Sequence, residues 1–158
     1  MLQLKNNYII DESLDIMIWA IPENDDWMII PIKQQIELIN NNDSKFKPWL
    51  DKYKYYDRFP DHSREFYQSK CGEFLDKYNN MLLSHSFLLG DSLMFADVAI
   101  FPFIRQCAHV DPKWFENKFP NLNEWLTNWK SLDIFLSVMN KYQYWDPNNN
   151  PEIVNFNK

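Results

Sequence analysis

Glycine is nearly absent from this 158-residue chain, which has 2 glycines against 9 prolines. Loops that wrap a phosphate or a dinucleotide need several glycines at fixed spacing, because their backbone turns sharply and approaches the ligand closely. The scarcity of glycine therefore argues against P-loop and dinucleotide-binding folds. It also predicts few turns with left-handed backbone.

Cysteine pairs, an excess of cations and long apolar runs are lacking as well. Cys71 and Cys107 have no CxxC or metal-ligand spacing, and we expect both to be buried, reduced thiols in helices. His62, His85 and His109 likewise share no metal spacing with acids or cysteines, so we predict no metal site. They are interpreted as ordinary surface or loop histidines.

The net charge of −6 argues against nucleic acid as a partner. No apolar run reaches the length of a membrane span, and the first ten residues do not resemble a signal peptide. We therefore expect a cytoplasmic protein without a membrane partner. With 46 % apolar and 17 % aromatic residues, the chain can form one core rich in large rings.

The first ten residues differ from the rest because they alternate in polarity. Leu2 and Leu4 alternate with polar neighbours, and Tyr8 to Ile10 follow an Asn-Asn pair. This pattern predicts a β-hairpin. A lone hairpin is marginal in water, so we expect it either to be disordered or to pair with a second copy.

In the remaining segments, the spacing of apolar residues and the capping residues predict helices. Asp11 can cap a helix that Pro22 ends, and Asp43 or Ser44 can open another that has Pro48 in its first turn. Residues 61–84 form the longest predicted helix. Residues 96–108 are apolar nearly all round, which predicts a helix buried on every side and strained at Pro102.

Two helices are expected beyond a short turn that begins at Pro112. Pro120 opens the first of them, and Ser131 can cap the last. The Asn- and Pro-rich tail, residues 146–158, is expected to be loosely held. The fold class predicted from these patterns is all-α, a helical bundle preceded by a short hairpin.

Four segments in this order resemble the C-terminal half of a glutathione S-transferase. They are IIDESLDIMIWA (9–20), FKPWLDKYKYYDRFPDHS (46–63), FLLGDSLMFADVAIFPFIRQCAHVD (87–111) and PNLNEWLTNWKSLDIFLSVMNKYQYW (120–145). The resemblance implies a remnant of the end of a thioredoxin-like domain at 1–21. It further implies the family's all-helical C-terminal domain at 22–145 and a loose tail at 146–158.

The resemblance also implies roles for single residues. Glu12 and Ser13 match the pair that holds the γ-glutamyl end of glutathione, and chemistry agrees, because helix N–H groups and a hydroxyl suit a carboxylate while Glu accepts from an ammonium. Read on the residues alone, the same pair is simply a helix start. Asp97 matches the family's capping-box acid, but Met94 stands where Ser or Thr is usual, which predicts a weaker cap or a different helix start.

Aromatic residues of the resembling segments have two interpretations. Trp49, Tyr53, Tyr56 and Phe103 either line the family's apolar electrophile pocket or pack in the core at helical spacing. Arg105 lies in an otherwise apolar helix, so we expect it to form an ion pair with Asp97 or another acid. The Lys-rich stretch at 45–54 is interpreted as a solvated helix face.

Three functions remain open at this point. The catalytic Tyr, Ser or Cys of the family lies in the part of the thioredoxin-like domain that the resemblance does not reach, so we expect no catalytic residue here and no independent transferase activity. Alternatively, a separate thioredoxin-like partner or a strand-exchanged homodimer completes a glutathione-conjugating site. The third possibility is a protein–protein interaction module. No cofactor is expected, and glutathione is the candidate ligand.

Overall fold

The N-terminal hairpin is formed in the computed structural model, which describes residues 1–22, 26–28, 32–144, 146–148, 150 and 153. Strand β1 (Leu2–Gln3) pairs antiparallel with β2 (Ile9–Ile10). Asn7 takes a left-handed backbone with φ of 63°, a conformation that asparagine tolerates better than most residues. The predicted hairpin is thus confirmed. It is ordered within one chain, and its pairing with a second copy stays a prediction.

Helix α1 (Ser13–Ala20) follows the hairpin, with Glu12 at the N-cap position. The prediction that Asp11 caps this helix is wrong, because Asp11 lies one residue before the cap. No side-chain hydrogen bond caps α1 at all. Leu14, Met17 and Ile21 pack against the core, and the helix ends before Pro22.

Residues 32–54 form one continuous helical rod. It consists of α2 (Ile32–Asn41), a π-helical stretch η2 (Asn42–Phe46) and α3 (Lys47–Lys54). The prediction that Asp43 or Ser44 opens a new helix is therefore wrong. Pro48 explains the π-helical stretch, since proline has no N–H and its ring crowds the carbonyl four residues earlier, whereas the wider turn relieves that crowding.

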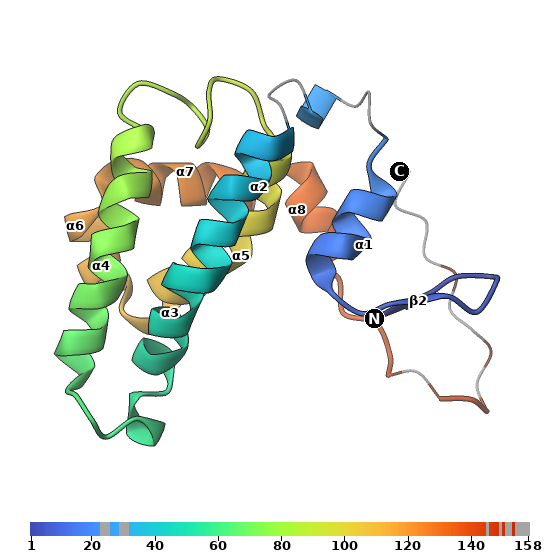
Figure 1. Ribbon diagram of the computed structural model, residues 1–158, viewed down its shortest axis with the longest axis horizontal. Helices are drawn as coiled ribbons and strands as arrows, with labels where there is room; N and C mark the ends of the chain where they lie inside the picture. The colour runs from blue at the N-terminus through green and yellow to red at the C-terminus, as the bar shows by residue number, and fades with distance from the viewer. Residues whose placement is uncertain (23–25, 29–31, 145, 149, 151–152, 154–158) are drawn as a thin grey trace.

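The bundle is completed by α4 to α7. The helices are α4 (Arg64–Met81), the central α5 (Phe95–Val110), the short α6 (Pro112–Lys118) and α7 (Pro120–Ser131). Two short 3-10 helices, η1 (Asp26–Met28) and η3 (Tyr56–Arg58), lie before α2 and after α3. The rod α2–α3 and helix α4 lie side by side, with the hairpin and α1 at the opposite end of the molecule from α4 and α6 (Figure 1).

Helix α5 is the central helix. Its composition predicted burial on every side, and this prediction is wrong, because one side is exposed. Its buried residues are Phe95, Ala96, Asp97, Ile100, Phe101, Ile104, Cys107 and Ala108. Pro102 and Gln106 are exposed on the opposite side. Proline is tolerated on this side because the helical bond that its missing N–H would make lies at the surface of the bundle.

The last helix, α8 (Asp133–Val138), begins two residues after Ser131. The prediction that Ser131 caps it is wrong: Leu132 is at the N-cap position, and the Ser131 hydroxyl donates to the Asn128 carbonyl oxygen at 2.6 Å. None of the six residues of α8 is buried. Most of the predicted loose tail lies outside the described residues.

Candidate functional site

The start of α1 carries the two residues predicted to hold glutathione. Glu12 and Ser13 are both exposed, and the Glu12 carbonyl accepts from the N–H of Ile16 at 3.1 Å. The free N–H groups of the first turn can receive a carboxylate. Asp11 and Asp15 add two more carboxylates nearby in the chain, so this end of α1 suits an ammonium group as much as a carboxylate. A γ-glutamyl group carries both.

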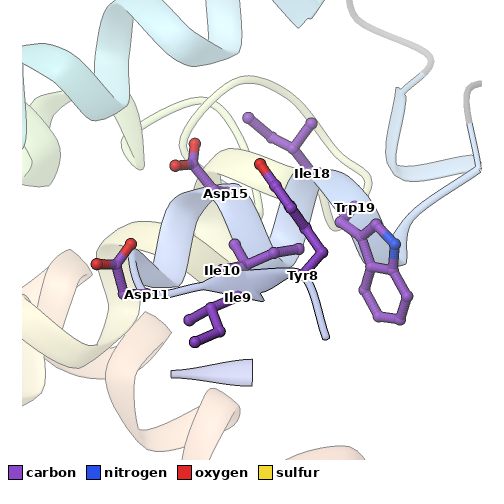
Figure 2. Close-up of a pocket in the computed structure, with 7 residues that line it drawn as sticks. All are labelled: Tyr8, Ile9, Ile10, Asp11, Asp15, Ile18 and Trp19. Carbon is purple, nitrogen blue, oxygen red and sulfur yellow. The ribbon is translucent and has the colours of Figure 1, made fainter. Parts of the chain in front are cut away.

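A shallow hollow of about 350 Å³ lies between the hairpin and α1. Its lining consists of Tyr8, Ile9, Ile10, Asp11, Asp15, Ile18 and Trp19, drawn in Figure 2. Tyr8 and Trp19 are 62 % and 56 % exposed, so two large rings lie in contact with water here. Glu12 and Ser13 do not line this hollow. The predicted glutathione residues and the lining of this hollow are thus adjacent in sequence but do not form one enclosed site.

The four aromatic residues predicted for an electrophile pocket have separate environments. Trp49 is half-buried against Phe66 and Tyr67 of α4, with ring centroids 6.3 and 6.4 Å away. Tyr53 is fully buried, whereas Tyr56 is 46 % exposed. For Trp49 and Tyr53, these contacts favour the core-packing interpretation. The pocket role of the four residues remains a prediction.

Tyr53 is held by a polar network that the sequence did not reveal. Its hydroxyl accepts from the Gln68 amide nitrogen at 2.7 Å, and the same nitrogen lies 3.5 Å from the Asp111 carboxylate. The Arg64 guanidinium lies over the Tyr53 ring at 5.6 Å and donates to the Val110 carbonyl at 3.1 Å. The only signal in the sequence was the Asp111-Pro112 pair, which is typical of a helix start; Asp111 does cap α6 by accepting from Trp114 N–H.

Burial, and not this network, keeps Tyr53 protonated. Burial raises the pKa of Tyr53 to about 12, although the bond from Gln68 and the charge of Arg64 act in the opposite direction. A phenol with such a pKa does not ionise near neutral pH. Tyr53 can therefore support packing and donate a hydrogen bond, but it cannot act as a phenolate base.

Removal of the Tyr53 hydroxyl should have a modest, measurable cost. Tyr53→Phe leaves the buried ring and removes the acceptor of the Gln68 amide, so we expect a loss of about 1–2 kcal/mol in the free energy of unfolding. Urea denaturation followed by circular dichroism measures it. The exposed Tyr56→Phe is the matched control, with an expected change below about 0.5 kcal/mol. Equal effects in the two variants would contradict a specific role for the network.

Asp97 and Arg105 lie on the same helix but do not pair. One Asp97 carboxylate oxygen accepts from the Leu88 N–H at 2.9 Å and the other from the Met94 N–H at 3.1 Å. Arg105 lies over the Phe135 ring at 5.5 Å. The expected ion pair between them is thus absent, because Asp97 faces the helix start. Within the described residues the ion pairs are Lys47–Asp51 and Lys70–Glu73, and His85 Nδ1 lies 3.5 Å from the Asp91 carboxylate.

Met94 occupies the N-cap position of α5, and the cap is completed from another helix. The Gln35 side chain of α2 is fully buried, and its carbonyl oxygen accepts from the Ala96 N–H at 3.0 Å. Its amide nitrogen donates to the Trp27 carbonyl at 2.9 Å. Gln35 therefore supplies an oxygen acceptor to the first turn of α5, where Met94 offers only a weak sulfur acceptor. No local motif in the sequence pointed to it.

Among the described residues, the cysteines are buried and one histidine stacks on an aromatic ring. Cys71 and Cys107 are fully buried, and the contact with Cys71 together with burial raises the pKa of the Cys107 thiol. His62 stacks on Phe66 with ring centroids 4.1 Å apart. Where the structure describes side chains, no group of three potential metal ligands is found. No helix in the described part of the chain is long and apolar enough to cross a bilayer.

Comparison with known proteins identifies the fold. Residues 48–128, about half of the chain, match the family model described as the glutathione S-transferase C-terminal domain. The chain belongs to this family. The match includes α3 to α6 and most of α7, so the bundle is the family's helical domain.

A solved structure shows the same fold over more of the chain. It is a glutathione S-transferase of class Gtt2 from Vibrio parahaemolyticus, with a TM-score of 0.65 and 18 % identity. The match covers 85 % of this chain and 69 % of that one. At such low identity the likeness concerns the fold. No curated protein matched the chain.

Proposed function

We propose that this glutathione S-transferase-like chain does not conjugate glutathione by itself, and that its helical domain serves as a scaffold for interaction. The observation that carries the proposal is the exposure of the two residues predicted to hold glutathione. Glu12 and Ser13 are exposed and lie outside the lining of the neighbouring hollow. Small-molecule sites enclose most of their ligand, whereas a γ-glutamyl group at this position would be held from one side.

The state of three buried groups supports the same proposal. Activation of glutathione requires a group that stabilises its thiolate. Tyr53, Cys71 and Cys107 are fully buried in the core, and the pKa values of Tyr53 and Cys107 are raised. These groups serve packing and are not available to a thiol that approaches the surface.

The proposal is tested by calorimetric titration with glutathione and by a conjugation assay with an activated chloronitrobenzene. We expect no saturable heat and no turnover above the uncatalysed rate. Turnover that survives purification, and that falls in both Glu12→Gln and Ser13→Ala, would overturn the proposal. Glu116→Gln and Ser69→Ala change exposed residues elsewhere and are the matched controls.

A second candidate function is a transferase completed by another chain. The exposed rings of Tyr8 and Trp19 and the unpaired edges of the two-stranded hairpin support it, because such surfaces promote association. A strand-exchanged homodimer predicts that activity per chain rises with protein concentration. Tyr8→Ser and Trp19→Ser should then abolish both dimerisation and activity, as sedimentation and the conjugation assay would show. Activity independent of concentration would contradict this candidate.

A further inference from the structure

A second hollow, of about 370 Å³, opens where α5, α7 and α8 meet. It is lined by Val98, Phe101, Pro102, Arg105, Trp129, Ile134, Phe135 and Val138. The Phe101 ring stacks on Trp129 at 4.8 Å between centroids and meets Phe135 edge-on at 5.3 Å. The volume is within the range of small-molecule pockets, and every lining side chain but one is apolar. The walls therefore favour an apolar ligand body.

Arg105 is the exception among the lining residues. It is half-buried, its guanidinium lies over the Phe135 ring, and no carboxylate in the described part of the chain forms an ion pair with it. A guanidinium remains charged at all ordinary pH values and offers a planar fork of donors that matches a carboxylate. A partly desolvated cation beside apolar walls is best satisfied by an anion that enters the hollow.

Residues of both charge signs occur near Arg105. The pKa of His109, one helical turn further along α5, is lowered by burial and by the positive charges of Arg105 and of Lys130 on α7. Asp133 stands in the first turn of α8, next to the lining residue Ile134. Among the lining residues Arg105 alone is charged, so its guanidinium decides the sign of the ligand that the hollow attracts.

We propose that the hollow between α5, α7 and α8 binds a small amphipathic carboxylate, whose apolar body packs on Phe101, Trp129 and Phe135 and whose carboxylate pairs with Arg105. A singly charged head matches the single guanidinium better than a phosphate dianion does. The site shares no residue with Glu12 and Ser13, so it is independent of the function proposed above.

Three probes with the same ten-carbon tail test the head group. Decanoate, decanol and decyltrimethylammonium are titrated into the full chain by calorimetry, below the concentration at which they form micelles. Decanoate should bind with one site per chain. Decanol should bind at least tenfold more weakly, and decyltrimethylammonium should not bind, because Arg105 repels it.

Variants locate the site. Arg105→Gln should weaken decanoate binding by about 10- to 100-fold, the loss expected for hydrogen bonds between charged partners. Lys130→Gln, which does not change a lining residue, should weaken it by less than about threefold. Ile134→Asp places a negative charge on a side that is already 47 % exposed, and it should abolish decanoate binding with little effect on folding.

Three results would each overturn the proposal. They are the absence of saturable decanoate binding, equal affinities for decanoate and decanol, and an affinity for decanoate that neither Arg105→Gln nor Ile134→Asp changes. Thermal melting of each variant without ligand separates loss of binding from loss of fold. Should Arg105→Gln fail to fold, the head-group comparison and Ile134→Asp still decide the question.

Discussion

Replacing Gln35 by leucine should lower the free energy of unfolding by about 2–4 kcal/mol. The buried Gln35 side chain joins α2 to the first turn of α5, because its oxygen accepts from Ala96 N–H and its nitrogen donates to the Trp27 carbonyl. Leucine removes both bonds: loss of the acceptor of the buried Ala96 N–H costs about 1–3 kcal/mol, and loss of the bond to the Trp27 carbonyl costs about 1 kcal/mol more. Urea denaturation of the whole chain measures the loss.

A control and a rescue make this result specific. Gln34→Leu changes the exposed neighbour on the same helix and should cost less than about 0.5 kcal/mol. Met94→Ser provides a hydroxyl at the N-cap position of α5, where a side-chain oxygen accepts from the first-turn N–H groups. It should recover about 1 kcal/mol in the Gln35→Leu background and less in the wild-type background. Additive effects of the two changes would contradict the cap from α2.

The capping of α5 shows where reasoning from sequence ends. Asp97 was predicted as the capping acid, and its carboxylate does accept from Met94 N–H. Met94 stands where Ser or Thr is usual, but the compensating side chain, Gln35, lies 61 positions before Ala96 in the chain. Local patterns predict local bonds. Only the packing of α2 on α5 could reveal that a glutamine completes the cap.

The aromatic residues and Arg105 illustrate a second limit. Helical spacing correctly predicted that Tyr53 lies on the inner face of its helix, but spacing cannot distinguish a core from a pocket wall. Arg105 and Asp97 are eight residues apart, which corresponds to about 12 Å along one helix axis. The structure instead places Arg105 against Phe135 of α8, a helix whose start the sequence misjudged.

The predicted helix boundaries were wrong where the same residues can either start a new helix or continue an existing one. Asp43, Ser44 and Pro48 are typical of a helix start, and in isolation they favour one. In the rod α2–α3, the π-helical stretch accommodates Pro48 without a break. Buried Asn42 in this stretch accepts from the Tyr78 hydroxyl at 3.3 Å, so α4 secures the continuous form. Tertiary contacts thus selected the geometry.

The free energy of unfolding of the wild-type chain, minus that of the Asp97→Asn variant, should fall as the pH rises from about 4 to about 6. Burial raises the pKa of Asp97 to about 6, although the bonds from Leu88 and Met94 N–H act against it. In the unfolded chain the pKa is about 3.9. Between these values the folded state holds a proton that the unfolded state has lost, so unfolding releases it and stability decreases as the pH rises. With about 1.4 kcal/mol per pKa unit, the change should reach about 2–3 kcal/mol.

The Asn variant isolates this effect because it keeps an acceptor oxygen for one of the two backbone N–H groups and cannot titrate. Urea denaturation of both chains at intervals from pH 3.5 to 8 gives the difference directly, free of the titration of other carboxylates. Asp57→Asn, at an exposed position, should show a flat difference over the same range. A wild-type advantage that grows as the pH rises would mean that the bonds from Leu88 and Met94 outweigh burial and lower the pKa of Asp97.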